Sequence, residues 1–249
     1  MILRRFIVPA TGCASYLFGC TSKGELGVVD PHADLVEEYL SVSDSIGARV
    51  AQVFDTHVHA DHHSGARELA ARSGGRLRLP EGAPVDYEFD PLTDNEQVTL
   101  GNTSVRVIST PGHAWAHACL LVTDETRGPD PWLVFTGDTL FVGAVGRPDL
   151  HGEERELAKA LQQSIHDRLL ALPDWIEVHP GHVGGSACGA GISSNPSSTI
   201  GFERRHNLLL GAEAGEFVDR VLAQLEPAPR EFQEIYEENR REEAATRRK

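Results

Sequence analysis

The sequence is poor in cysteine, in basic residues and in long apolar runs, and each shortage excludes a class of protein. The four cysteines are scattered and form no CxxC pair, which argues against a disulfide framework and for reduced thiols. The net charge is −14 without a basic patch, which argues against a nucleic-acid partner. No segment approaches the roughly 18 consecutive apolar residues of a membrane span, and the start, MILRRFIVPATG, lacks the apolar stretch and cleavage site of a signal peptide. We therefore expect a soluble, cytoplasmic protein with no membrane or nucleic-acid partner.

The length of 249 residues and the absence of repeats or low-complexity linkers favour a single domain over residues 1–249. Residues 230–249, REFQEIYEENRREEAATRRK, are mostly charged, with acidic and basic side chains four positions apart. This pattern predicts a charged C-terminal helix or tail that is solvated or frayed.

Apolar periodicity predicts a chain in which short strands and helices alternate. Residues 14–31 have the pattern of a β-hairpin, residues 48–56 that of a strand, and residues 76–136 that of several short strands joined by turns. Ser64 and Gly74 have the residue types that cap the two ends of a helix. Helices are expected at residues 33–47, 65–73, 153–172 and 216–226.

The segment FDTHVHADHHSGARELA, residues 54–70, is unusually rich in side chains that bind metals. It contains four histidines and two aspartates directly after a predicted strand. The spacing of two between His57 and His59 directs both rings to one side of an extended chain, while Asp61 and His62 begin to turn away. One alternative is an ordinary polar surface loop. Two adjacent sets of metal ligands are the sharper interpretation.

Three further ligand-type residues follow later strands, and each has a glycine beside it. They are His113 in PGH, Asp138 in TGD and His182 in PGH. Glycine lets the backbone pass close to a crowded centre, and strand ends hold side chains in fixed positions. Together with the first segment, these residues predict a metal site.

The motifs THVHADHHSG, TPGH, TGDTLF and HPGH resemble, in order, those of the metallo-β-lactamase superfamily. The resemblance covers about residues 10–210 and implies an α+β fold, the four-layer αββα sandwich. In the dinuclear hydrolases of that superfamily, it would place His57, His59 and His113 on one metal and Asp61, His62 and His182 on the other. Asp138 would lie between the two metals.

Two further segments, GDTLFVGAVGRPDL and HPGHVGGSACGAGISSNPSSTIGFERRHN, are similar to those of the persulfide dioxygenase branch of the superfamily. This resemblance implies one catalytic Fe(II), held by His57, His113 and Asp138. The other motif residues would then orient the ligands and bound water or hold a second metal; they are His59, Asp61, His62 and His182. Zinc is expected as an alternative or adventitious occupant of such a cluster.

The same resemblance implies that the protein oxidises glutathione persulfide, or a similar small thiol persulfide, with O₂ to sulfite and free thiol. Two imidazoles and a carboxylate leave coordination positions open on iron for such a reaction. Expected partners are the persulfide, O₂, a sulfurtransferase of the rhodanese type in the same pathway, and a second copy of the chain in a homodimer. The first alternative is a glyoxalase II-like thioester hydrolase with two metals, and the second is an inactive scaffold or redox-responsive binding protein.

Several residues near these motifs allow two interpretations. Arg147 either binds substrate or holds Asp149 in an ion pair. Cys188 either carries sulfur or packs in the interior, and for the other three cysteines packing is expected. Trp115 and His117 distinguish PGHAWAH from the commoner form of this motif, and they leave the shape of the substrate pocket open.

Overall fold

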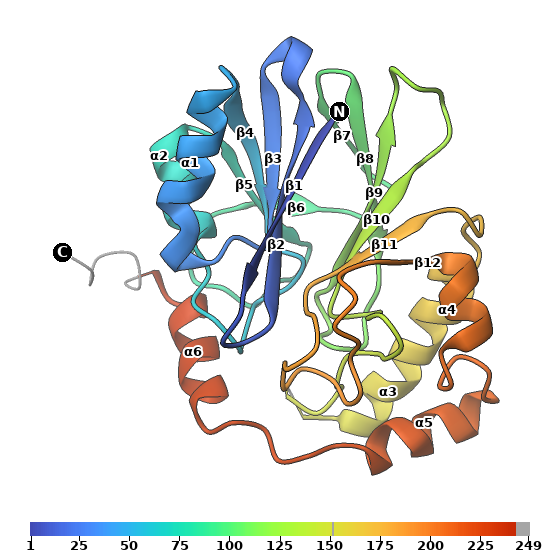
Figure 1. The fold of residues 1–249 in the computed structure, drawn as a ribbon. Helices are drawn as coiled ribbons and strands as arrows, with labels where there is room; N and C mark the ends of the chain where they lie inside the picture. The colour runs from blue at the N-terminus through green and yellow to red at the C-terminus, as the bar shows by residue number, and fades with distance from the viewer. Residues whose placement is uncertain (151, 243–249) are drawn as a thin grey trace.

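The computed structural model describes residues 1–150 and 152–242, and two six-stranded β-sheets lie at its centre (Figure 1). The strands of each sheet are neighbours in the same order as in the sequence. The first sheet contains β1 (Ile2–Val8), β2 (Cys13–Cys20), β3 (Glu25–Val29), β4 (Arg49–Phe54), β5 (Arg76–Pro80) and β6 (Asp90–Leu92). The second contains β7 (Gln97–Leu100), β8 (Thr103–Ser109), β9 (Ala118–Asp124), β10 (Leu133–Gly137), β11 (Glu177–Pro180) and β12 (Ser198–Thr199).

Both sheets are mixed. In the first, β1, β2 and β3 pair antiparallel, and β3 to β6 pair parallel. In the second, only β10 and β11 are parallel, and the other neighbours are antiparallel. The parallel strands β4, β10 and β11 each run into a loop that carries ligand-type side chains.

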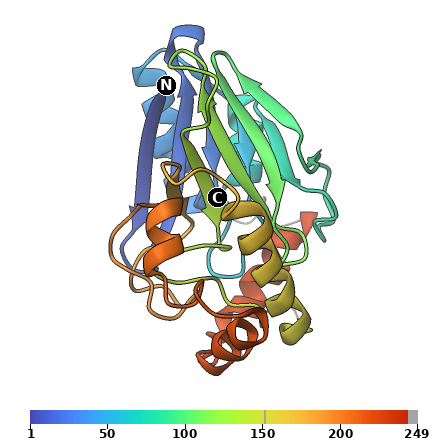
Figure 2. The ribbon, with the colours of Figure 1, turned by 90° about the vertical axis from the view of Figure 1, so that its right-hand side faces the viewer.

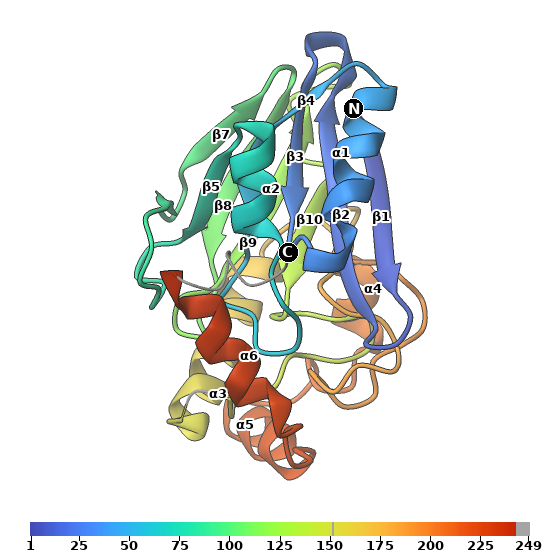
Figure 3. The same ribbon diagram turned by 90° about the vertical axis from the view of Figure 1, so that its left-hand side faces the viewer.

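Helices cover the outer faces of the two sheets. The helices α1 (Val36–Ser45) and α2 (Ala66–Ser73) lie on the first sheet (Figures 1 and 3). On the side of the second sheet lie α3 (Glu154–Gln163), α4 (Ile200–His206) and α5 (Ala214–Ala223) (Figure 2). Two short 3₁₀ turns occupy Thr21–Lys23 and Ala33–Leu35. These layers confirm the expected αββα sandwich.

The apolar side chains alternate along the strands, as a two-residue period requires. In β2, Tyr16 and Phe18 face the second sheet, whereas Leu17 packs toward the helices α1 and α2. All three are at most 1% exposed. Because both faces of β2 are buried, its sequence is a nearly continuous apolar run.

Most of the predicted regular elements are present. The predicted hairpin corresponds to β2 and β3, which pair antiparallel. The hydroxyl of Ser64 accepts the backbone N–H of Ala66 at the start of α2, and Gly74, at φ +69°, ends this helix. The strands β1 and β12 and the helix α4 were not predicted. In β1 the exposed Arg4 and Arg5 interrupt the apolar pattern, because this strand lies at the edge of its sheet.

The prediction of one regular helix over residues 153–172 is wrong in its second half. The helix α3 ends at Gln163, and a π-helix follows at Ser164–Leu169. At this point the Ser164 hydroxyl donates a hydrogen bond to the carbonyl of Pro111, 2.7 Å away. A Cβ atom on Gly112 would lie 2.4 Å from Cα of Leu161. The helix therefore changes its winding where the loop before His113 presses against it.

The described part of the charged C-terminal segment is helical, as expected, but it is docked on one face rather than fully solvated. Helix α6 (Glu231–Arg240) packs on the body of the protein, and its Phe232 is 8% exposed. Its apolar side chains and its charged face were both visible in the sequence, but the surface that it covers was not. Residues 243–249 of the predicted tail lie outside the described residues. Among the described residues, none of the helices combines the length and the apolar character that a membrane span requires.

Candidate metal centre

Four loops that follow strands of both sheets meet at one end of the sandwich (Figure 1). The loop after β4 carries His57, His59, Asp61 and His62. The loops after β8, β10 and β11 carry His113, Asp138 and His182, respectively. An isolated bridge between Cys13 and His182 joins the two sheets here. The structure thus brings all seven predicted motif residues into one region.

His57, His113 and Asp138 form one compact group. Each offers a ligand atom, and these atoms lie within 4.8 Å of one another. Nε2 of His113 lies 3.6 Å from Oδ2 of Asp138, and all three residues are at most 1% exposed. Nε2 of His57 and Oδ2 of Asp138 are buried without a hydrogen-bond partner among the described residues. Buried polar atoms are normally paired, so these atoms fit ligation of a transition metal ion.

Neighbouring groups fix which nitrogen of these two histidines carries the proton. The Thr56 hydroxyl donates to Oδ2 of Asp30, so the same oxygen can accept from Nδ1–H of His57, 3.0 Å away. Nδ1–H of His113 donates to the carbonyl oxygen of Arg147 at 2.8 Å, since a carbonyl can only accept. In both rings Nε2 therefore keeps its lone pair for a metal.

His59 is held from behind by two carboxylates. Its Nε2 lies 3.2 Å from Oδ1 of Asp30 and 3.6 Å from Oδ1 of Asp55. Its Nδ1 is buried without a hydrogen-bond partner among the described residues. This atom also forms a possible ligand group with His57 and Asp61. Burial opposes charge on His59, but Asp30 and Asp55 outweigh it and raise its pKa well above the usual range, so Nδ1 would have to lose a proton before it could bind a metal.

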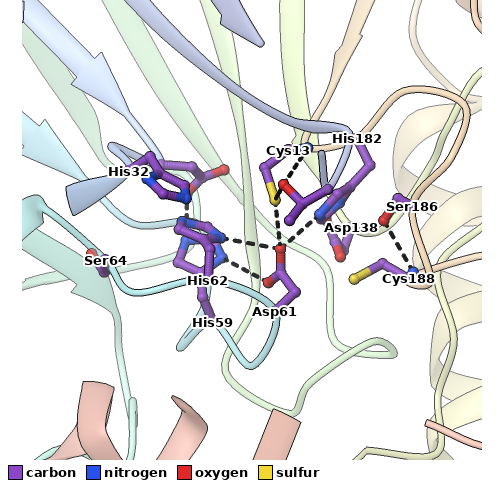
Figure 4. A network of polar contacts seen from close by, with 12 residues as sticks. Cys13, His32, His59, Asp61, His62, Ser64, Asp138, His182, Ser186 and Cys188 are labelled. Carbon is purple, nitrogen blue, oxygen red and sulfur yellow. Dashed lines mark hydrogen bonds and ion pairs between the residues drawn. The ribbon is translucent and has the colours of Figure 1, made fainter. Parts of the chain in front are cut away.

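Asp61 joins a second group of polar side chains, shown in Figure 4. Its Oδ2 lies 2.8 Å from Nε2 of His182 and 3.1 Å from Nδ1 of His62. The thiol of Cys13 donates to the same oxygen at 3.1 Å. On its other side, His182 places Nδ1 2.9 Å from Oδ1 of Asp138. The described side chains of this group thus largely bind one another.

The pKa shifts divide the histidines into two kinds. Burial lowers the pKa of His57 and of His113, so both rings are neutral at pH 7, the form that binds metals. Burial also opposes charge on His59, His62 and His182, but neighbouring carboxylates outweigh it. Asp61 raises the pKa of His62 to about 9, and Asp138 and Asp61 raise the pKa of His182 well above its usual range. The neutral rings of His57 and His113 can bind a metal without losing a proton. The histidines beside carboxylates are cationic in the metal-free protein and must lose a proton first.

Two cysteines lie beside this centre, and for one of them, Cys13, sequence reasoning did not suggest it. Cys13 was expected to pack in the core or at an edge, but its sulfur lies beside Asp61 and His62 in a possible ligand group. Cys188 forms another such group with Asp61 and His182. Burial raises the pKa of Cys188 to about 12, so its thiol is neutral. Nothing in the local sequence around Cys13 indicates this contact, because the start of β2 meets the loop after β4 only in the folded chain.

The guanidinium of Arg147 forms its hydrogen bonds with groups of the protein itself. Its Nε and a terminal nitrogen donate to the two carboxylate oxygens of Asp149 at 2.7 and 2.8 Å. Further N–H groups bind the carbonyl oxygens of Ala187 and Glu226, and the residue is 5% exposed. This geometry supports the ion-pair interpretation over substrate binding.

Trp115 and His117, which sequence reasoning left open, have different positions. Trp115 is 51% exposed and donates its indole N–H to Glu153, so it lies at the surface beside the centre. His117 is 1% exposed, and its ring stacks on that of His57 with 5.1 Å between the centroids.

Sequence reasoning missed Asp30 and Asp55, which hold the ring of His59. Both directly follow strands, the same position that identified His113, Asp138 and His182.

Known proteins resemble the chain in both sequence and structure, although no protein-family model matches it. The hydroxyacylglutathione hydrolase of Nitrosococcus oceani is 30% identical over 171 residues, which are 68% of this chain and 61% of that protein. The chain thus spans less than two thirds of that relative. A solved metallo-β-lactamase from Staphylococcus aureus overlays with a TM-score of 0.91 at 30% identity, over 96% of this chain and 72% of the other. The solved ETHE1 from Myxococcus xanthus overlays with a TM-score of 0.85 at 26% identity, over 98% and 99% of the two chains.

Proposed function

Since the chain belongs to the metallo-β-lactamase superfamily of metalloenzymes, we propose that it is a persulfide dioxygenase. Its substrate would be glutathione persulfide or a similar low-molecular-weight thiol persulfide. The products would be sulfite and the free thiol, with both atoms of O₂ and one oxygen of water entering sulfite. The overlay with ETHE1 supports this proposal, because it extends over nearly the whole of both chains.

The observation that carries the proposal is the group of His57, His113 and Asp138. Two neutral imidazoles and one carboxylate converge there, and Nε2 of His57 and Oδ2 of Asp138 have no hydrogen-bond partner among the described residues. Two histidines and a carboxylate are the donor set of many non-haem iron oxygenases. This set leaves positions for a sulfur ligand and for O₂.

Most polar side chains of the second group contact one another, whereas Nε2 of His62 is buried without a hydrogen-bond partner among the described residues. His182 has a carboxylate beside each ring nitrogen, and Oδ2 of Asp61 has three neighbours within hydrogen-bond distance. A second metal would have to replace these contacts. In the proposal, His182 instead holds Oδ1 of Asp138 and leaves Oδ2 for the iron.

The chain's own residues would bind, orient and shield the reactants. The Thr56 hydroxyl and the Arg147 carbonyl fix the proton on the outer nitrogens of His57 and His113. Phe141 and Cys188 are fully buried beside Ala60, in the loop that carries His57 and His59, and exclude water. Bound Fe(II) would supply the redox chemistry that allows O₂ to react with the persulfide sulfur.

A thioester hydrolase with two metals is the second candidate. The 30% identity to hydroxyacylglutathione hydrolase favours it, and so does Nδ1 of His59, which has no hydrogen-bond partner among the described residues and is not needed for the single iron. In that reaction two bound metals would activate water for hydrolysis of the thioester.

Oxygen uptake and sulfite formation distinguish these candidates. The protein is reconstituted with Fe(II) or with Zn(II) and given either glutathione persulfide or a glutathione thioester. The proposal requires iron-dependent O₂ uptake with matching sulfite. Zinc-dependent thioester cleavage without O₂ uptake would overturn it in favour of the hydrolase.

Variants connect the activity to the proposed ligands. His113→Ala and Asp138→Ala each remove one of three protein ligands, so both should lose bound iron and activity together. His206→Ala, which changes an exposed histidine on α4, is the matched control and should retain both. Full iron content and full activity in either ligand variant would contradict the assignment.

A further inference from the structure

The C-terminal helix α6 lies across the loop that carries the proposed ligands (Figure 3). The chain leaves α5, crosses the end of the sandwich and reaches the side of the first sheet (Figure 1). There Phe232 packs in a cluster with Ala60, and Tyr236 packs beside a cluster that contains Val58. Val58 and Ala60 alternate with the histidines and Asp61 of the ligand loop, so α6 contacts the side chains between the ligands.

The ligand loop lacks a hydrogen-bonded backbone of its own. Among the described residues, the peptide groups of residues 57–62 make no hydrogen bond to another backbone group. An irregular segment of this kind needs side chains to hold its polar groups. The positions of His57, His59, Asp61 and His62 therefore depend on contacts from elsewhere in the chain.

Asn239 of α6 supplies such contacts. Its Nδ2 donates to the carbonyl oxygens of His59 at 2.9 Å and of His62 at 2.8 Å. Its Oδ1 accepts the backbone N–H of Ser64 at 3.0 Å. The side-chain amide of Asn239 thus makes three hydrogen bonds to the backbone of one loop, two through its NH₂ group and one through its oxygen. The two carbonyls belong to residues of the metal motif, so Asn239 restrains the backbone between the ligands.

We propose that Asn239 is a positioning residue for the metal centre, and that docking of α6 sets the affinity for the metal. The sequence separation of about 180 residues between Asn239 and His59 means that the last helix completes a loop from the first sheet. The inference requires metal binding at the proposed ligands, but it holds for either candidate reaction.

The first test measures metal affinity rather than activity. Fe(II) is titrated anaerobically into the full chain in competition with a coloured chelator. Asn239→Ala should raise the dissociation constant about tenfold, the lower end of the usual effect of removing a group that orients metal ligands. The matched control is Gln233→Ala, which removes an amide from an exposed position of the same helix. Equal affinities for Asn239→Ala and the unchanged protein, or an equal loss in Gln233→Ala, would overturn the proposal.

The second test uses the unchanged protein and does not depend on the folding of a variant. If docking of α6 raises metal affinity, metal binding must stabilise the docked helix by the same factor. Hydrogen exchange at the Ser64 amide and along Glu231–Arg240 should therefore slow about tenfold when Fe(II) is added. Unchanged exchange in these segments on metal binding would refute the coupling, whatever activity the loaded protein has.

Discussion

His117 lies behind two proposed ligands, and replacing it tests how the centre is supported. Its Nε2 accepts the backbone N–H of Asp138 at 3.1 Å, and its ring stacks on His57 at an angle of 22°. Burial lowers the pKa of His117 to about 3, so the ring is neutral and Nε2 can accept. Nδ1 must then carry the proton, which it donates to the Thr110 hydroxyl at 2.9 Å.

The substitution His117→Leu retains most of the side-chain volume but removes both nitrogens. It leaves the Asp138 N–H buried without an acceptor, which costs about 1–3 kcal/mol. The Thr110 hydroxyl loses a further hydrogen bond, worth about 1 kcal/mol, although it keeps its contact with Cys119. The free energy of unfolding should therefore fall by about 2–4 kcal/mol. Metal affinity should fall as well, because the backbone of a ligand has lost its support.

Denaturant unfolding of the metal-free protein measures the first effect, and chelator competition measures the second. His206→Leu, at an exposed position, is the control and should change the unfolding free energy by less than about 0.5 kcal/mol. A similarly small change in His117→Leu would refute the reasoning, because the Asp138 N–H would then have another acceptor. A loss of stability with unchanged metal affinity would refute the link between His117 and the ligand.

Three further substitutions have defined outcomes. Gly137→Ala should lower the unfolding free energy by about 1–3 kcal/mol, because Gly137 has φ +46° and a Cβ atom would lie 2.5 Å from Oγ1 of Thr56. Arg147→Lys should cost about 2 kcal/mol, because lysine cannot form the two-pronged pair with the neighbouring carboxylate. Glu96→Gln should cost about 1 kcal/mol at pH 7, a value reduced because Glu96 is 26% exposed, and nothing at low pH.

The pH dependence of the last prediction follows from the direction of the pKa shift. Burial opposes ionisation of Glu96, but the hydrogen bonds from Arg78 and Thr93 together with the Arg78 charge outweigh burial and lower the pKa of the carboxyl. The stabilisation is therefore complete above the unfolded pKa of about 4.3 and disappears as the pH falls through the lower folded value. Thermal unfolding of both proteins from pH 7 to pH 3 measures the difference. A constant difference over this range would contradict the assignment, and Glu234→Gln on the exposed face of α6 is the control.

The fold was largely predictable because its strands and helices have strong local patterns. The two faces of β2 and the caps of α2 depend on a few neighbouring residues, so sequence reasoning identified both elements. The edge strand β1 has little apolar periodicity, because its arginines are exposed, and it was missed. The winding of the chain after Gln163 depends on a contact with a loop 53 residues earlier in the sequence, which no local pattern contains.

The site was predictable where a residue follows a strand, because strand ends of a sandwich meet at the same edge. From this rule the sequence predicts that His113, Asp138 and His182 belong to one site. Their roles as metal ligands stay a prediction. The rule does not reveal contacts between distant segments. The approach of Cys13 to Asp61 and the docking of α6 through Asn239 both require the folded arrangement of the two sheets.

The sequential order of the strands within each sheet has a consequence for refolding. Pairing of β1 to β6 and of β7 to β12 closes mostly short loops, so each sheet can assemble from contacts that are near in sequence. The complete donor set, by contrast, needs His57 from one sheet and Asp138 from the other. During refolding, the capacity to take up metal should therefore return after the circular dichroism signal of the strands. The delay between these two signals would measure how long the sheets β1–β6 and β7–β12 take to dock against each other.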